Sequence, residues 1–418
     1  MSLAIRNATL DGQHVGLRVE EQRIAAVGPD VQSEAADDVL DAAGLALVPP
    51  LVNGHTHAAM TLMRGYGDDL PLMQWLQDRI WPTEAKLTAD DVYWGTRLAC
   101  VEMIRSGTVR FWDMYWQPQA VAHAVEDAGI RASVALPLID GLDPDKSEAL
   151  RTEAERTLAV LADVGERITP TLGPHAIYTV SEKSLQWVAE LSEKRQLPVH
   201  IHLSETEGEV RDCVAAHGVR PAMYLDRIGL LTPRTLLAHG VWLDDSELSL
   251  VGERGATVVT NPVSNLKLAV GGVFPYPKAR DHRIPVGLGT DGAASNNALD
   301  LFQDVKHLAL MQKHETRDPA AMPASEAWAV ATGQRAPLLG QSGRITAGEP
   351  ADFLLVRADA PELTPGDLTA NLVYAASGSV VDTTVVAGRV LMRGGEIGDE
   401  AEVRDGAIAS ARRLGVIE

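Results

Sequence analysis

Short apolar runs alternate with segments of helical length through the middle of the chain. The segments 88–106, 181–195 and 299–313 have the length and polarity of helices, and Thr88 followed by Asp91 resembles a capping box at the start of the first one. The apolar runs have the length of buried strands. They lie at 47–52, 109–112, 132–139, 168–172, 199–203, 235–238, 257–260 and 285–288. Eight alternations of strand and helix predict a (β/α)8 barrel, with its chemistry at the carboxyl ends of the strands.

The two ends of the chain carry a different pattern, in which short alternating runs are separated by turn residues such as Asp11-Gly12 and Gly394-Gly395. This pattern is typical of small antiparallel strands. The runs lie at 3–5, 15–19, 23–27, 352–356, 380–386 and 390–392. We therefore predict an α/β protein with a (β/α)8 TIM-type barrel over residues 49–344. A small β-sandwich domain is expected from residues 1–48 and 345–418 together.

Residues able to bind a metal follow five of the predicted barrel strands. Because the carboxyl ends of these strands meet on one face, the side chains are expected to converge. Imidazole and carboxylate donors suit zinc and leave a coordination position open for water, which indicates a metal-dependent hydrolase. The residues are His55 and His57 after the first strand, His175 after the fourth, His202 and Glu205 after the fifth, His239 after the sixth and Asp291 after the eighth.

The predicted metal ligands are His55, His57, His202 and Asp291. Residues two apart on a strand point to the same side, so His55 and His57 can bind one ion. His202 is preferred over His200 because it is nearer the carboxyl end of its strand, and His200 is expected to be a buried, hydrogen-bonded core residue. Taken alone, His55 and His57 would indicate a turn with exposed histidines, and Asp291 would indicate a turn-forming Asp-Gly.

The predicted catalytic groups are Glu205, His239 and Asp291. Glu205 lies just past its strand, where a carboxylate can act as general acid and base above the metal; a solvated loop acid is the alternative. His239 can either bind the metal or orient the attacking water. The second role is favoured, because three histidines and an aspartate already complete a metal site.

Two absences narrow the chemistry. Lysine is missing from the segment 168–175, where a binuclear barrel hydrolase usually carries a carbamylated lysine, so one divalent metal ion per subunit is expected, with zinc the best match. The chain has only two cysteines, Cys100 and Cys213, far apart in sequence. This excludes a disulfide framework and the cysteine-ligated zinc site of cytidine-deaminase-type enzymes, and it fits a reducing compartment.

The charge of the chain favours a small-molecule substrate. It has 57 acidic and 37 basic residues, a net charge of −20, which argues against binding nucleic acid or an anionic membrane. The first residues lack the apolar core of a signal peptide, and no run is long enough to cross a membrane. A cytoplasmic location is the expectation.

Four motifs, at residues 51–57, 202–206, 264–268 and 289–297, resemble those of the amidohydrolase superfamily. Within it the chain is most similar to the 5'-methylthioadenosine/S-adenosylhomocysteine deaminases, and the resemblance runs from the first barrel strand to the terminal β domain. It implies a homo-oligomeric deaminase of a purine nucleoside. Water activated by the metal would attack C6 of adenine, and Glu205 would carry a proton toward N1, giving hypoxanthine and ammonia.

The same resemblance implies three substrate-binding residues besides Glu205. Glu84 would accept hydrogen bonds from the ribose 2'- and 3'-hydroxyls, His175 would meet a ring nitrogen of adenine, and Trp75 would form a wall of the pocket. The alternatives are that Glu84 is a surface acid, His175 a hydrogen-bonded core histidine and Trp75 a packing aromatic.

The chain departs from the family at the end of the third strand. An arginine that would bind the carboxylate of S-adenosylhomocysteine is missing from residues 136–140, and Arg151 lies further along. This favours the uncharged substrates 5'-methylthioadenosine, adenosine and 5'-deoxyadenosine. Two other hypotheses remain: a related hydrolase of a free purine or pterin base or of a triazine, and a metal-free barrel that serves as a binding protein.

Overall fold

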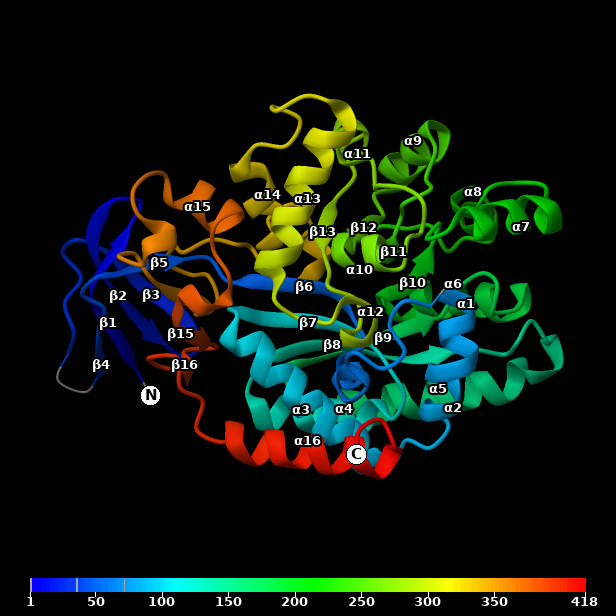
Figure 1. Ribbon diagram of the computed structural model, residues 1–418, viewed down its shortest axis with the longest axis horizontal. Helices are drawn as coiled ribbons and strands as arrows, with labels where there is room; N and C mark the ends of the chain where they lie inside the picture. Colours follow the sequence, from blue (N-terminus) through cyan, green and yellow to red (C-terminus); the bar gives the residue numbers. More distant parts are fainter. Residues whose placement is uncertain (1, 35–36, 71) are drawn as a thin grey trace.

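The computed structural model describes residues 2–34, 37–70 and 72–418, and a barrel of parallel strands lies at its centre (Figure 1). Each of these strands pairs with the next one along the chain. The backbone N–H of Asp291 donates to the carbonyl of His55 at 2.9 Å, which links the last strand to the first. The strands are β6 (Leu51–Thr56), β7 (Thr108–Met114), β8 (Arg131–Leu138), β9 (Ile168–Pro174), β10 (Val199–Leu203), β11 (Thr235–His239), β12 (Thr257–Thr260) and β13 (Val286–Leu288). The predicted barrel is confirmed.

Helices follow the strands and cover the outside of the barrel (Figure 1). Thr88 caps α3 and exchanges hydrogen bonds with Asp91, which confirms the predicted capping box. The helices are α1 (Leu72–Trp75), α2 (Trp81–Glu84), α3 (Ala89–Arg105), α4 (Pro118–Ala128), α5 (Ser147–Ala162), α6 (Glu182–Arg195), α7 (Glu207–His217), α8 (Pro221–Arg227), α9 (Asp245–Arg254), α10 (Pro262–Lys267), α11 (Tyr276–Asp281), α12 (Ala293–Asn296), α13 (Leu301–Thr316), α14 (Ala324–Ala331), α15 (Leu368–Tyr374) and α16 (Glu400–Leu414).

A second sheet is built from both ends of the chain. Its strands are β1 (Leu3–Leu10), β2 (Gln13–Glu20), β3 (Arg23–Gly28), β4 (Asp38–Asp41), β5 (Leu45–Val48), β14 (Phe353–Arg357), β15 (Val381–Val386) and β16 (Arg389–Met392). The order is β16-β15-β14-β5-β1-β2-β3, with β4 paired to β1. The antiparallel pairing of β14 with β5 joins the two ends. The chain leaves this sheet after β16, and α16 packs along α3 beside the barrel (Figure 1). The exact division into residues 1–48, 49–344 and 345–418 remains a prediction.

The first predicted apolar run, 47–52, is divided between the two sheets. Its first half ends β5 of the terminal sheet, and its second half begins β6 of the barrel. Pro49 and Pro50 separate them, because proline has no N–H to donate to a strand ladder. One apolar run therefore contributes a strand to each part of the fold.

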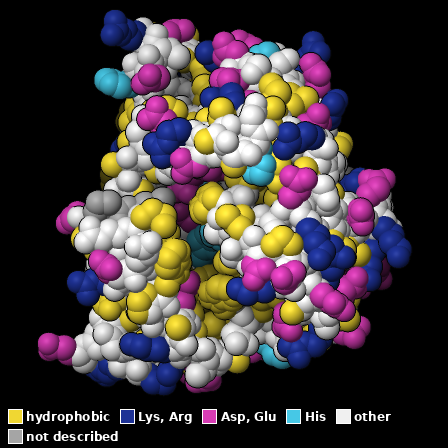
Figure 2. Space-filling view, turned by 90° about the vertical axis from the view of Figure 1, so that its right-hand side faces the viewer, with side chains coloured by type: hydrophobic (Ala, Val, Ile, Leu, Met, Phe, Trp, Pro, Cys, Tyr) yellow, Lys and Arg dark blue, Asp and Glu magenta, His cyan; other side chains and the backbone are white. Residues whose placement is uncertain are grey.

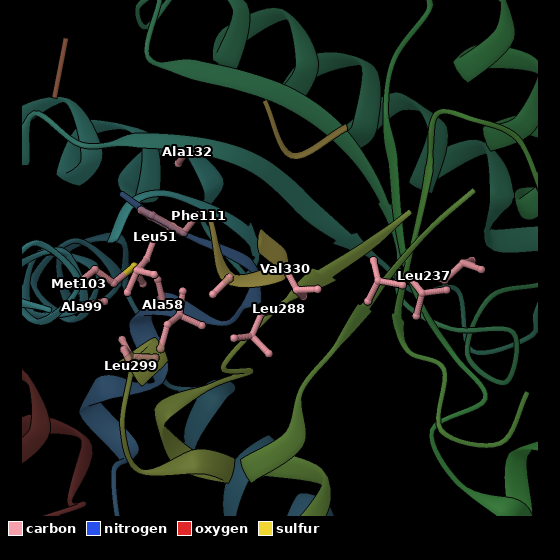
Figure 3. Close-up of a cluster of buried hydrophobic side chains, with 14 of the residues drawn as sticks. Leu51, Ala58, Ala99, Met103, Phe111, Ala132, Leu237, Leu288, Leu299 and Val330 are labelled. Atoms are coloured by element: carbon pink, nitrogen blue, oxygen red, sulfur yellow. The ribbon is translucent and has the colours of Figure 1, made fainter. Parts of the chain in front are cut away.

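The barrel strands are buried on both sides, which explains why their sequences are almost continuously apolar. Figure 3 shows part of this core, where Leu51, Phe111, Leu237 and Leu288 project from four different strands. Gly289 allows the close approach of the last strand to the first: a Cβ there would lie 2.9 Å from the backbone nitrogen of His55. Among the described helices, none has both the length and the apolar character that crossing a bilayer requires.

Candidate metal centre and active site

His57 and His202 face each other at the mouth of the barrel. Nδ1 of His57 lies 2.7 Å from the carbonyl oxygen of Met114, and Nδ1 of His202 lies 2.8 Å from the carbonyl oxygen of His175. Because a carbonyl only accepts, each Nδ1 carries the ring proton, and each Nε2 keeps a free lone pair. The two Nε2 atoms are 3.4 Å apart. Two lone pairs that face each other at this distance are stabilised by a cation between them.

His55 and Asp291 complete this group. Nε2 of His55 is buried and has no hydrogen-bond partner among the described residues. It lies 3.4 Å from Oδ1 of Asp291, and Nε2 of His57 lies 3.3 Å from the same oxygen. Donor atoms about 2.0–2.1 Å from a tetrahedral zinc are separated by roughly 3.3–3.4 Å, so the observed spacing fits such an ion.

The charge states of these groups also suit a divalent metal. Burial lowers the pKa of His55 to about 4 and holds the pKa of His202 well below its usual range, so both rings are neutral. Burial would raise the pKa of Asp291, but contact with His55 and the charge of neighbouring imidazoles hold it well below its usual range. Neutral imidazoles and an ionised carboxylate are the forms that bind metal.

Three residues at the ends of the strands have left-handed backbone conformations. Ser204, His239 and Asp291 have φ angles of 52°, 74° and 64°. A residue with a side chain pays on the order of 1–3 kcal/mol for such a conformation, which is found in turns and at functional sites. Each of these residues follows or ends a barrel strand, so the chain turns sharply and presents its polar groups to the mouth.

Glu205, the predicted general acid and base, lies beside His239. Its carboxylate is 3.9 Å from Nε2 of His239, and both side chains are buried. Burial raises the pKa of Glu205, which makes its protonated form more accessible near neutral pH. The alternative of a solvated loop acid is wrong for this residue.

Glu209 supports Glu205, a role that was not predicted from the sequence. Its two carboxylate oxygens accept the backbone N–H groups of Ser204 and Glu205 at 2.8 and 2.9 Å. This fixes the backbone on which the Glu205 side chain stands. Thr206 caps the same turn by accepting the N–H of Glu209, so the spacing Thr-x-x-Glu was the available signal.

His200 is buried and hydrogen-bonded, as expected, but its partner is a predicted ligand. Its Nε2 lies 2.7 Å from Nδ1 of His55, and its ring stacks edge-on against Trp112. A ligand histidine needs a fixed tautomer, and the partner of its second nitrogen fixes it.

His175 lies next to this group without joining it. Its ring centroid is 4.7 Å from that of His202, and its Nδ1 is 2.9 Å from the hydroxyl of Thr179. Burial lowers the pKa of His175 to about 3, so the ring is neutral. A neutral ring here can form a directed hydrogen bond with a neutral ligand.

Glu84 and Trp75 come from the segment 72–84, in which a π-helical turn (Leu76–Ile80) links α1 to α2. Such turns are frequent at functional sites. Glu84 lies against Tyr115 and Trp116, and burial raises the pKa of its carboxyl. The indole N–H of Trp75 donates to the carbonyl of Tyr66 at 3.3 Å, and its ring belongs to the main core. The place of Trp75 in the pocket remains a prediction.

A space-filling view shows a hollow with histidine side chains on its floor and apolar and acidic side chains around it (Figure 2). The Amidohydrolase family model matches residues 46–391 of the chain. The chain belongs to the amidohydrolase family. The resemblance found in its sequence motifs is thereby confirmed.

Relatives in the amidohydrolase family include nucleoside deaminases. A 5'-deoxyadenosine deaminase from Methanoregula boonei is 49% identical over 403 residues, which cover 94% of this chain and 90% of the relative. A 5-methylthioadenosine/S-adenosylhomocysteine deaminase from Archaeoglobus fulgidus is 43% identical over 388 residues, 92% and 91% of the two chains. A crystal structure of an adenosine deaminase from Xanthomonas campestris with bound zinc has a TM-score of 0.92, 33% identity and 99% coverage of both chains.

Proposed function

We propose that this protein is a metal-dependent deaminase that converts the adenine of 5'-methylthioadenosine, 5'-deoxyadenosine or adenosine to hypoxanthine, with release of ammonia. The observation that carries this proposal is the convergence of four ligand atoms beside a buried pair, Glu205 and His239. The names of its relatives support a 5'-substituted adenosine as substrate.

His55, His57, His202 and Asp291 would hold one divalent ion, for which zinc suits the donor set. Such an ion lowers the pKa of a water molecule to roughly 7 and so supplies hydroxide at neutral pH. The neutral rings and the ionised Asp291 are prepared for this without any change in their protonation.

Glu205 would move the protons. Its carboxylate accepts a proton from the attacking water and delivers it to N1 of adenine, while the water oxygen bonds to C6. His239 and Asp291 would orient the water, and its remaining proton would then go to the amino group, which leaves C6 as ammonia. The raised pKa of Glu205 suits this double role, because it makes the carboxylate a better proton acceptor.

On the substrate side, Glu84 would bind the two ribose hydroxyls. Its carboxylate lies within electrostatic range of His57, so the ribose would extend from the metal centre toward α2. His175 would meet a ring nitrogen of the purine through Nε2, while its Nδ1 is held by the hydroxyl of Thr179. Trp75 would close the pocket from α1.

The preference for an uncharged 5'-group follows from the surroundings of Arg151. Its guanidinium donates to the carbonyl of Lys183 at 3.3 Å and lies over the ring of Trp187, at 5.6 Å, so it is engaged between α5 and α6. The loop after β8 presents Ile139 and Leu142, both exposed. A homocysteine carboxylate would meet no arginine from this segment.

A substrate panel tests the proposal. Purified, metal-analysed protein is incubated with matched concentrations of 5'-methylthioadenosine, 5'-deoxyadenosine, adenosine, S-adenosylhomocysteine and free purine bases, and the adenine-to-hypoxanthine absorbance change is followed with ammonia release. We expect the highest kcat/KM on an uncharged nucleoside. If only a free base is deaminated, the substrate is a base and the proposed nucleoside substrate is wrong. Equal or better kcat/KM on S-adenosylhomocysteine would contradict the specificity.

A further inference from the structure

The metal ligands and proton carriers leave one sequence motif without a role, the pair Ser264-Asn265. Both residues lie on the short helix α10, which follows β12, and both are buried. Polar side chains in a buried position need hydrogen-bond partners. Their partners are two residues of the active site.

Ser264 acts on Asp291. Its hydroxyl lies 2.7 Å from Oδ2 of Asp291 and donates to it, since an ionised carboxylate only accepts. The other oxygen, Oδ1, accepts the N–H of Gly292 at 2.8 Å and faces the rings of His55 and His57. Ser264 therefore fixes the rotation of the carboxylate and leaves Oδ1 directed at the metal centre.

Asn265, the next residue, acts on His239. Its side-chain oxygen lies 2.9 Å from Nδ1 of His239, and the side-chain nitrogen of Asn261 lies 3.2 Å from the same atom. The shorter contact decides the tautomer, because an unprotonated nitrogen would be repelled by an amide oxygen at that distance. Nδ1 thus carries the proton, and Nε2 is directed toward Glu205.

We propose that α10 is a positioning element that serves two neighbouring groups through consecutive residues. Ser264 holds Asp291 in the orientation for metal binding, and Asn265 holds His239 in the tautomer and orientation for proton transfer. The second half rests on the proposed deaminase function, whereas the first rests only on the ligand geometry. The consequence is a separation of effects: loss of Ser264 weakens metal binding, and loss of Asn265 slows turnover.

The test measures zinc affinity and turnover separately in the full-length protein. Zinc dissociation constants come from competition with a chromophoric chelator, and kcat and KM come from zinc-saturated protein with 5'-methylthioadenosine. Ser264→Ala should weaken zinc binding by about 10- to 100-fold, the usual effect of losing a group that supports a ligand. Asn265→Leu, which keeps the side-chain volume, should lower kcat by about 10- to 100-fold with the zinc constant and KM unchanged.

Conservative variants separate positioning from folding. Ser264→Thr keeps the hydroxyl, so its zinc affinity should be at least tenfold higher than that of Ser264→Ala. Asn265→Asp keeps the acceptor, so its kcat should be at least tenfold higher than that of Asn265→Leu. Ser249→Ala removes a hydroxyl that donates to Glu253 on α9 and should change neither quantity.

Three results would overturn the proposal: wild-type zinc affinity in Ser264→Ala, wild-type kcat in Asn265→Leu, or the same loss of both quantities in both variants without recovery by threonine or aspartate. A wild-type protein that deaminates no nucleoside refutes the proposed function instead. The zinc measurement on Ser264→Ala then still decides the first half.

Discussion

Nδ1 of His55 lies 2.7 Å from Nε2 of His200, in the buried floor of the barrel. The two residues are 145 positions apart in sequence and come from different strands, β6 and β10. For His55 to bind metal through Nε2, its Nδ1 must carry the proton and donate it to His200. His200 therefore fixes the tautomer of a predicted ligand and is not itself placed to bind the metal.

Replacing His200 should weaken metal binding. We expect His200→Ala to raise the zinc dissociation constant by about 10- to 100-fold, because His55 loses the acceptor that orients it. Chelator competition measures this directly. His123→Ala, at an exposed position of α4, is the matched control. An unchanged zinc constant in His200→Ala would show that the contact has no part in metal binding.

Glu205 should carry most of the proton transfer. Glu205→Gln keeps the size of the side chain but cannot accept and return a proton, so kcat should fall by ~10²–10⁴-fold. Its zinc content, measured by elemental analysis, should stay at the wild-type level, since Glu205 is not among the predicted ligands. Full activity in this variant would remove Glu205 from the mechanism.

Glu209 should affect turnover because it positions Glu205. In Glu209→Gln one of the two backbone N–H groups at Ser204 and Glu205 loses its acceptor. We expect kcat to fall by about 10-fold or more with little change in zinc affinity, by analogy with other groups that support a catalytic residue. Stopped-flow turnover at saturating substrate measures it. A change in KM alone would mean that the 204–209 turn shapes the pocket and does not orient the catalytic group.

Metal should stabilise the folded chain. A ligand that binds only the native state adds about 2.7 kcal/mol at a free concentration of roughly 100 times its Kd. The Tm of chelator-treated protein should therefore rise as zinc is added, and Asp291→Ala should reduce this rise. A Tm that does not depend on zinc in the wild-type protein would argue against a site at these ligands.

Arg151 should have no part in substrate choice. Because its guanidinium is engaged by Lys183 and Trp187, Arg151→Ala should leave the ratio of kcat/KM for S-adenosylhomocysteine and 5'-methylthioadenosine unchanged. Steady-state kinetics on both nucleosides tests this. A selective loss on S-adenosylhomocysteine would show that Arg151 reaches the substrate carboxylate.

Much of the fold was predictable from the sequence, because barrel strands are short, apolar and regularly followed by helices. The runs 199–203 and 257–260 match β10 and β12 residue for residue. The run 47–52 was predicted as one barrel strand but divides at Pro49-Pro50 into β5 and β6. Both sides of the prolines are apolar, and only tertiary pairing assigns them to different sheets. The predicted ligand residues could be selected from the sequence because they stand at strand ends.

The supporting contacts were harder to predict. His200 and His55 meet only through the register of strands far apart in sequence, and no local pattern encodes that pairing. Asn265 belonged to a recognised motif, but its partner His239 depends on how α10 folds back over the mouth. Glu209 left a local signal, the capping spacing from Thr206, yet its reach back to Ser204 and Glu205 appears only in three dimensions.

The most direct test of the account is deamination in heavy-oxygen water. Zinc-loaded and chelator-treated protein would be incubated with 5'-methylthioadenosine, and the product would be analysed by mass spectrometry alongside ammonia release. We expect the zinc-loaded protein to give the hypoxanthine nucleoside with one heavy oxygen at C6 and an equal amount of ammonia, and the chelator-treated protein to give almost none. Equal activity without metal, or no conversion by the zinc-loaded protein, would contradict metal-dependent hydrolytic deamination.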